Sequence, residues 1–312
     1  MSPVKTLVTG GAGFIGSNLV NALVERGDDV RVLDNFSTGN RANLEGLDVE
    51  VVEGELRSYE RVHAATRGVE VVYHLGALGS VPRSVQDPLT SSAVNVEGTL
   101  NVLLAARDEG VRRVIFSSST SVYGSSGELP TPESTPLDPI SPYGVAKLAA
   151  ERYCISFSRV YHSFETVVLR YFNVFGPRQS PFSQYAGVVP LFIAAIDAGE
   201  PITIYGDGEQ SRDFTYVANV VDATIRATDA DGASGRAFNI GAAAPASVNH
   251  LAETIGTILG KPVEKRFEPA RAGDIRDSWA DITAARETLG YQPQVDLASG
   301  LELTAEAILA RV

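Results

Sequence analysis

Short apolar runs alternate with segments of helical spacing over the first half of the chain. Apolar runs of about four to eight residues are typical of buried strands, and apolar residues three or four positions apart are typical of helices that cover a sheet. The predicted strands are 4–10, 29–34, 49–54, 69–76, 111–119 and 165–176, and the predicted helices are 14–27, 99–110 and 142–161. This alternation predicts the α/β class, with a doubly wound parallel sheet.

The pattern changes after about Asn173, where loops rich in Pro, Gly and Asp interrupt shorter elements. Examples are "GPRQSPFSQYAG" at 176–187 and "PARAGD" at 269–274. We expect a smaller, mixed lobe that covers the carboxyl edge of the sheet. The run "AFNIG" at 237–241 is predicted to be a late strand that returns to the first sheet. The predicted division is therefore 1–172, with returning segments near 213–241, and 173–312 as mainly the second lobe.

Composition narrows the class of protein. The chain has 312 residues, of which 44% are apolar and 21% charged, and its net charge is -12. That charge argues against a general binder of nucleic acid or of anionic membranes, although a local arginine cluster can still bind an anionic small molecule. The single cysteine, Cys154, excludes an intrachain disulfide and is typical of a reducing, cytoplasmic setting. No apolar run is long enough for a membrane span, and no targeting segment is evident.

A glycine-rich turn follows the first predicted strand. "TGGAGFIGS" contains Gly11-x-Gly13-x-x-Gly16 between a strand and a helix, where backbone N–H groups can approach a pyrophosphate. Asp34 ends the next predicted strand, eighteen residues after Gly16. A carboxylate there would accept a hydrogen bond from a ribose 2′-hydroxyl and repel a 2′-phosphate, so the pattern favours NAD over NADP.

A tyrosine and a lysine are paired in "SPYGVAK" at 141–147. Only four lysines occur in the chain, and Lys147 follows Tyr143 by four positions. Ser141 can cap a helix whose first residue is Pro142, which would place Tyr143 and Lys147 on one face. An ammonium near the phenol would lower its pKa from about 10 toward neutrality and make it a general base and acid. The alternative is a solvated contact on a surface helix.

Seven motifs in order resemble one known family. They are "TGGAGFIGS", "HLGA", "FSSSTSVYG", "SPYGVAK", "RYFNVFGPR", "GDGEQSRDFTYV" and "RAGDIRDSWAD", and they extend over nearly the whole chain. Together they resemble the extended short-chain dehydrogenase/reductases, in particular the nucleotide-sugar epimerase/dehydratase group. Two positions depart from the pattern: Glu55 replaces the usual aspartate that faces adenine, and Gly76 replaces a common alanine.

The resemblance implies a Rossmann domain over 1–172 with bound NAD. It also implies that Ser119 hydrogen-bonds the reacting sugar oxygen beside Tyr143, while Lys147 supports the tyrosine. The implied cofactor-binding residues are Gly10, Gly13, Phe14, Ile15, Gly16, Asp34, Asn35, Phe36, Ser37, Thr38, Gly39, Glu55, Leu56, Leu75, Gly76, Ala77, Asn95, Ser117, Tyr143, Lys147 and Phe172. No metal is expected.

The implied reaction begins with oxidation of a sugar at C4. Dehydratases and decarboxylases of the group carry acidic residues just before "VYG", where this chain has Thr120 and Ser121. This difference favours simple 4-epimerisation, in which the hydride returns to the other face of the ketone and NAD is recycled. A UDP-glucuronate 4-epimerase, a dehydratase or decarboxylase, and a non-catalytic NAD-sensing protein on the same fold remain as alternatives.

The resemblance also implies a site for a UDP-sugar in the second lobe. Arg212 and Arg271 would bind the diphosphate, and Asp274 the nucleoside ribose. Ser278 and the stretch "GSVPRS" at 79–84 favour a pocket that admits N-acetylated as well as plain hexoses. The implied substrate-binding residues are Ser80, Ser119, Thr120, Asn173, Val189, Tyr205, Arg212, Arg271, Asp274 and Ser278. Helices near 92–109 and 142–161 carry apolar residues on more than one face, and the resemblance implies that this pair of helices forms a homodimer. The alternative is that these residues only cover the sheet.

Overall fold

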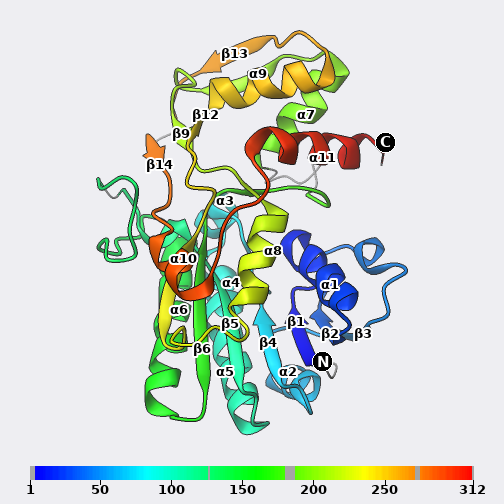
Figure 1. Cartoon of the computed structure of the whole chain (residues 1–312), viewed down its shortest axis with the longest axis vertical. Helices are drawn as coiled ribbons and strands as arrows, with labels where there is room; N and C mark the ends of the chain where they lie inside the picture. The colour runs from blue at the N-terminus through cyan, green and yellow to red at the C-terminus, as the bar shows by residue number, and fades with distance from the viewer. Residues whose placement is uncertain (1–3, 126, 180–186, 271–274, 311–312) are drawn as a thin grey trace.

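A sheet of parallel strands forms the centre of the part of the chain that the structure describes, residues 4–125, 127–179, 187–270 and 275–310 (Figure 1). In this computed structural model the strands lie in the order β11-β6-β5-β4-β1-β2-β3. Their bounds are β1 Lys5–Thr9, β2 Asp29–Asp34, β3 Glu50–Glu53, β4 Val71–His74, β5 Arg113–Ser119, β6 Glu165–Tyr171 and β11 Arg236–Ile240. The predicted α/β class and parallel sheet are confirmed, and so is the returning strand, because β11 pairs in parallel with β6.

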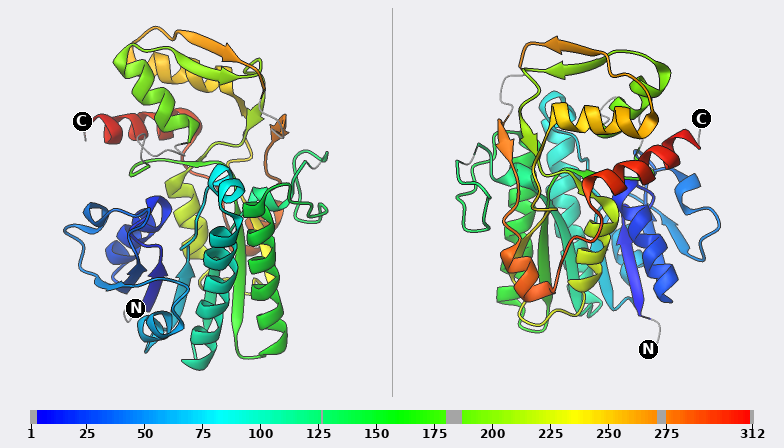
Figure 2. Two further views of the ribbon diagram at one scale, coloured as in Figure 1. Left: turned by 180° about the vertical axis from the view of Figure 1, so that it is seen from behind. Right: turned by 45° about the horizontal axis from the view of Figure 1, so that its top comes forward.

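Helices cover both faces of this sheet (Figure 2). The inner strands are buried on both sides, so consecutive apolar residues such as Val114 and Ile115 belong to two different clusters, whereas the edge strand β3 is largely exposed. One cluster contains α2 (Tyr59–Thr66), α5 (Gly98–Asp108) and α6 (Pro142–Val160); the other contains α1 (Phe14–Arg26) and α8 (Val217–Arg226). This two-sided burial explains why the strands read as continuous apolar runs.

Short helices lie at the carboxyl ends of the strands. They are α3 (Val81–Gln86), α4 (Pro88–Ser92), a π-helical segment (Ala93–Glu97) that leads into α5, and two 3₁₀ turns (Arg41–Leu44 and Thr120–Val122). Helices α3 and α4 both pack against α6. The predicted helix 142–161 is confirmed as α6, whereas the sequence pattern did not predict α3 and α4.

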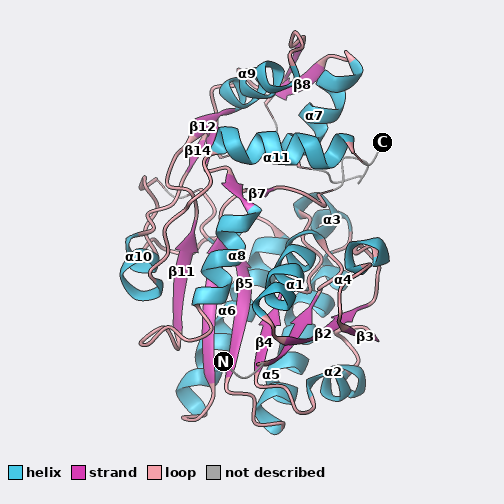
Figure 3. Ribbon diagram, turned by 45° about the vertical axis from the view of Figure 1, so that its right-hand side comes forward, coloured by secondary structure: helices cyan, strands magenta, loops and turns pink. Residues whose placement is uncertain are grey.

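The second lobe lies over the carboxyl ends of the strands (Figure 3). Its helices are α7 (Val188–Ala198), α9 (Val248–Leu259) and α11 (Leu297–Leu309). Its short strands pair as β8 (Ile202–Tyr205) with β13 (Lys265–Glu268), as β12 (Ala246–Ser247), β9 (Ser211–Arg212) and β14 (Asp277–Ser278), and as β7 (Val174–Phe175) with β10 (Thr215–Tyr216).

Late segments of the chain divide between the two lobes. Helix α10 (Thr283–Leu289) packs on β11 and α8, beside the central sheet, while α11 packs on α7 and α9. Within the described residues, no helix is both long and apolar enough to cross a membrane. The exact division at 172/173 stays a prediction.

Candidate active site

The glycine turn brings the start of α1 against the end of β1. Helix α1 is capped by Gly13, which offers no side chain to its first N–H groups. A Cβ on Gly16 would lie 2.1 Å from the carbonyl oxygen of Gly10, so only glycine lets the helix approach this closely. Gly10 has a φ of 70°, and a Cβ there would lie 2.7 Å from the Cα of Gly76. This contact gives a physical reason for glycine at position 10. A Cβ on Gly76 would itself lie 2.9 Å from the Cδ1 of Leu56.

Asp34 closes the other side of the turn. Its carboxylate accepts hydrogen bonds from the Ala12 N–H at 2.9 Å and the Phe36 N–H at 2.8 Å. The side chain is buried, yet it also lines the large cavity beyond the strand ends. A carboxylate has about four acceptor positions, so two remain for a ligand.

A cavity of about 920 Å³ extends from this turn along the strand ends. The predicted cofactor and substrate residues that line it are Gly10, Gly13, Phe14, Ile15, Gly16, Asp34, Asn35, Ser37, Thr38, Glu55, Leu56, Leu75, Gly76, Ala77, Ser80 and Ser117. Sequence reasoning missed Arg57 and Arg83, and also Ala307 and Ile308 on α11. Nothing in the local sequence of α11 could indicate that contact, because it depends on how the second lobe packs.

Six of the predicted cofactor residues do not line the cavity: Tyr143 and Lys147, which lie at the start of α6, and four others. Asn95 brackets the loop after β4, since its amide accepts from the Leu78 N–H at 2.8 Å and donates to the Leu78 carbonyl at 3.2 Å. The others are Phe36, which stacks on the Arg41 guanidinium, Gly39, which packs on Ala12, and Phe172, which lies in the core. These four residues contact neighbouring parts of the chain and not the space of the cavity. Glu55 lines the cavity, and its carboxylate is paired with Arg57.

The end of β5 and the start of α6 bring three predicted catalytic residues together. Ser119 is the last residue of β5, and its hydroxyl is close enough to the Tyr143 phenol to act on the pKa of that phenol. The Ser119 Oγ donates to the Ser121 Oγ at 3.1 Å and accepts from the Ser121 N–H at 3.2 Å. Ser141 caps α6 by accepting from the Gly144 N–H at 3.1 Å, and Pro142 is the first helical residue, as predicted. Tyr143 and Lys147 therefore lie one helical turn apart.

Lys147 is tied to the strand beneath it. Only 3% of its surface is exposed, and its Nζ donates to the Ser117 carbonyl at 2.8 Å. The ammonium also lies 4.8 Å from the centroid of the Phe116 ring, which partly compensates for its lost hydration. Burial lowers the pKa of Lys147 to about 8.

Tyr143 differs from the sequence prediction in its protonation. Burial raises the pKa of its phenol to about 12, and the hydrogen bond with Ser119 acts in the opposite direction with smaller effect. The predicted lowering is therefore wrong for the protein without ligands. The Lys147 ammonium is directed to the Ser117 carbonyl, so desolvation dominates at the phenol. A cation bound nearby would act to lower this pKa.

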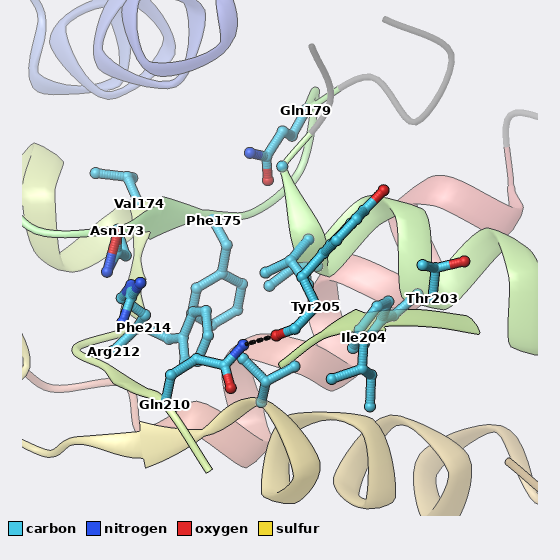
Figure 4. Close-up of a pocket in the computed structure, with 15 residues that line it drawn as sticks. Asn173, Val174, Phe175, Gln179, Thr203, Ile204, Tyr205, Gln210, Arg212 and Phe214 are labelled. Carbon is cyan, nitrogen blue, oxygen red and sulfur yellow. Dashed lines mark hydrogen bonds between the residues drawn. The ribbon is translucent and has the colours of Figure 1, made fainter. Parts of the chain in front are cut away.

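A second cavity of about 270 Å³ lies in the other lobe (Figure 4). Asn173, Val189, Tyr205 and Arg212 line it, as do the rings of Phe175, Phe192 and Phe214. It shares Gln179 and Gly187 with the first cavity, so the two are contiguous.

Polar groups in the second cavity remain available to a ligand. The Gln210 amide donates to the Tyr205 carbonyl at 2.7 Å, as Figure 4 shows, while its own Oε1 is buried without a partner. The Oε1 of Gln179 is likewise buried and unpartnered. Ser278 lies beside Arg212, its partner across β14 and β9. The predicted residues Arg271 and Asp274 lie outside the described part of the chain, and Thr120 is half-buried after Ser119.

The fold and the site together define a dinucleotide-binding protein of Rossmann type with a serine, tyrosine and lysine at the strand ends. A model of the family described as "NAD dependent epimerase/dehydratase family" matches residues 6–241, and the chain belongs to this family. The prediction of NAD as cofactor is thereby confirmed. The glycine cradle at Gly16 and the carboxylate of Asp34 fit that cofactor.

Similar proteins narrow the activity further. The UDP-glucose 4-epimerase of Mycolicibacterium smegmatis is 42% identical over 97% of this chain and 98% of that one. The structure of the UDP-glucose 4-epimerase of Thermotoga maritima with UDP-glucose has a TM-score of 0.94 and 40% identity, covering 98% of this chain and 99% of that one.

Other relatives carry different names. The UDP-N-acetylglucosamine 4-epimerase of Methanobrevibacter ruminantium M1, in complex with UDP-N-acetylmuramic acid, has a TM-score of 0.95 and 36% identity over the full length of both chains. A UDP-N-acetyl-alpha-D-glucosaminuronate decarboxylase of Bacillus cytotoxicus is 32% identical over 97% of each chain. These similarities support an NAD-dependent epimerase of UDP-sugars and leave the sugar open.

Proposed function

We propose that this protein is a 4-epimerase of UDP-hexoses that accepts UDP-glucose and UDP-galactose and also their N-acetylated counterparts. The observation that carries the proposal is the grouping of Ser119, at the end of β5, with Tyr143 and Lys147 in the first turns of α6. Ser119 is followed by two residues without a carboxyl group. Thr120 and Ser121 offer no acid or base for eliminating water, so oxidation and reduction at one carbon is the chemistry that remains.

The side chains act on the sugar 4-hydroxyl. Ser119 donates a hydrogen bond to that oxygen, and Tyr143 takes its proton as the C4 hydrogen leaves as hydride. Bound NAD supplies the hydride acceptor and then returns the hydride, so the reaction has no net redox change. Return to the opposite face of the 4-ketone inverts the centre, and Tyr143 gives the proton back. Lys147, held at the Ser117 carbonyl, places a positive charge beneath this proton transfer.

The two contiguous cavities suit the two ligands. We assign the larger cavity, lined mainly by residues of 1–172 and also by Ala307 and Ile308 of α11, to NAD. We assign the smaller one, lined by residues of 173–312, to the nucleotide of the substrate. Aromatic rings and free amide oxygens in the smaller cavity suit a nucleobase, and Arg212 suits a phosphate. Ser278, beside Arg212, is small enough to leave room for an acetamido group.

A panel of four UDP-sugars tests this proposal. Purified protein is incubated with UDP-glucose, UDP-galactose, UDP-GlcNAc and UDP-GalNAc, and the products are separated by chromatography. We expect interconversion within both pairs, with less than about tenfold preference for the plain hexoses. A larger preference or inactivity on acetylated sugars would contradict the wide pocket. Tyr143→Phe should abolish turnover and leave NAD bound; near-normal turnover would show that another group is the base.

A UDP-glucuronate 4-epimerase is the second candidate. Arg83 lines the larger cavity together with Ser80 and Ser117, and a guanidinium suits a sugar carboxylate. Adding UDP-glucuronate and UDP-galacturonate to the panel separates the two candidates. Conversion of the uronates alone would favour this second activity.

We also propose that two copies of the chain associate. Large apolar side chains are exposed on neighbouring helices: Val85 on α3, Leu89 on α4, and Val145 and Tyr153 on α6. Leu89 is 83% exposed and is accompanied by other exposed apolar side chains on these helices. Exposed apolar side chains that gather in this way are typical of an interaction surface. A second copy packed on α3, α4 and α6 would cover these side chains.

A further inference from the structure

One buried hydroxyl joins α3 to the helix that carries the catalytic tyrosine. Ser84 is 1% exposed. Its Oγ donates to the Val81 carbonyl at 2.7 Å and accepts from the backbone N–H of Tyr143 at 3.0 Å. The contact links two segments that are 59 positions apart in the sequence.

The first turn of α6 depends on this contact. The N–H groups at the start of a helix have no partners within the helix. Pro142 has no N–H, the Gly144 N–H bonds to the Ser141 Oγ at 3.1 Å, and the Val145 N–H bonds to the Ser141 carbonyl at 2.9 Å. The Tyr143 N–H is the one whose acceptor comes from another element, and that acceptor is Ser84.

The same short helix also forms part of the cavity wall. Ser80 caps α3 by accepting from the Arg83 N–H at 3.2 Å, and both residues line the larger cavity. Ser84 therefore connects a wall of the site to the backbone of Tyr143. A shift of α3 would be transmitted to the tyrosine through this hydrogen bond.

We propose that Ser84 is a positioning residue for the reaction, which holds the Tyr143 phenol in register with Ser119. The proposal rests on the assignment of Tyr143 as the proton-transfer group. Without the Ser84 hydroxyl, the Tyr143 N–H has no acceptor and must find one by moving the first turn of α6 or by admitting water. Misplacement of a reacting group by about 1 Å is enough to lower a rate by about 100-fold.

The test compares Ser84→Ala with Ser84→Thr and a matched control. Threonine keeps a hydroxyl that can donate to the Val81 carbonyl, so its oxygen should still accept from the Tyr143 N–H. Ser58→Ala removes a serine acceptor at another helix start: its Oγ accepts from the Arg61 N–H in the first turn of α2, and Ser58 lines neither cavity assigned to a ligand. All variants are measured as purified, NAD-containing enzyme on the most active sugar of the panel.

For Ser84→Ala we expect kcat to fall about 10- to 100-fold, with KM within about threefold and the NAD content unchanged. Ser84→Thr should recover most of the loss, and Ser58→Ala should keep wild-type kcat. A kcat for Ser84→Ala within twofold of wild type would overturn the proposal. So would a loss that Ser84→Thr fails to recover, or an equal loss in Ser58→Ala.

Hydrogen exchange gives a second readout that needs no substrate. The Tyr143 amide should exchange slowly in the wild type and at least tenfold faster in Ser84→Ala, while the Gly144 amide stays protected by Ser141. Unchanged exchange at Tyr143 would show that Ser84 does not hold this N–H. If Tyr143 exchanges faster in Ser84→Ala but the wild type is inactive on every sugar, Ser84 does hold this N–H and the proposed reaction is wrong.

Discussion

A buried ion pair lies directly behind the catalytic residues. Glu151 is one turn beyond Lys147 on α6, and its carboxylate is paired with Arg170 on β6. Their side chains are 0% and 4% exposed. Glu151 also accepts from the Ser118 hydroxyl at 3.1 Å, and Arg170 donates to the Tyr123 hydroxyl at 2.7 Å. The pair thus ties α6 to β6 and, through Ser118, to β5, the strand that ends at Ser119.

Replacing only one partner should destabilise the protein strongly. In Arg170→Met the Glu151 carboxylate would stay in the interior with one hydroxyl donor, and breaking a fully buried pair in this way costs about 3–5 kcal/mol. In the double variant Glu151→Leu/Arg170→Met no charge is left behind. The Ser118 hydroxyl then loses its acceptor, at a cost of about 1–3 kcal/mol, while Tyr123 still donates to Asn239.

The measurement is the free energy of unfolding in urea, followed by circular dichroism on protein freed of NAD. Arg112→Met is the matched control, because the Arg112–Asp229 pair is 46% and 78% exposed and should contribute less than about 1 kcal/mol. The double variant should be more stable than Arg170→Met. If Arg170→Met costs less than about 1 kcal/mol, or if the double variant is less stable than the single one, the reasoning from desolvation is refuted.

Three further predictions concern the cofactor turn, the lysine and the surface. Gly16→Ala should lose bound NAD, measured in an acid extract, because its Cβ would overlap the Gly10 carbonyl; Gly127→Ala, with open space around it, should keep it. Burial lowers the pKa of Lys147 to about 8, so between pH 10 and pH 8 this lysine binds a proton more readily in the unfolded chain than in the folded one. The free energy of unfolding therefore falls as the pH falls through this range. Relative to Lys147→Met, the wild type should therefore gain about 2 kcal/mol in unfolding free energy between pH 7 and 9.5; a constant difference would contradict this. Leu89→Asp with Val145→Asp should sediment as a monomer where the wild type is a dimer, and a monomeric wild type would exclude the proposed face.

Local signals in the sequence predicted much of the fold. The six strands of the first half and α6 were predicted from apolar runs, glycine stops and the Ser-Pro start. Both faces of the sheet are covered, so most residues of the inner strands are buried and apolar, whereas the edge strand β3 is largely exposed. The helices α3 and α4 were not predicted. They are too short for a period of 3.6 residues to be apparent, and α3 begins with a capping serine whose role appears only in three dimensions.

Some features of the candidate site were likewise predicted from local sequence, and others were not. The glycine turn, Asp34 and the Tyr143–Lys147 spacing are local features, so they were predicted and the structure places them at one edge of the sheet. The protonation of Tyr143 was predicted in the wrong direction, because a pKa depends on desolvation and on where the nearest charge points. Asn95 was predicted to contact the cofactor; in the structure its amide holds the loop at Leu78 and does not line the cavity, a position that depends on how the π-helical segment Ala93–Glu97 packs.

By itself, the amino-acid sequence predicted the parallel sheet, the glycine turn and the candidate pair Tyr143 and Lys147, because each of these is visible in local patterns of residues. Only the tertiary structure decided that α11 reaches the cofactor cavity, that Arg170 neutralises Glu151 behind the site, and that Ser84 holds the backbone of Tyr143. These contacts join residues that are far apart in the chain. No local pattern encodes them, because their energies arise from burial and from hydrogen bonds that form only when the elements pack.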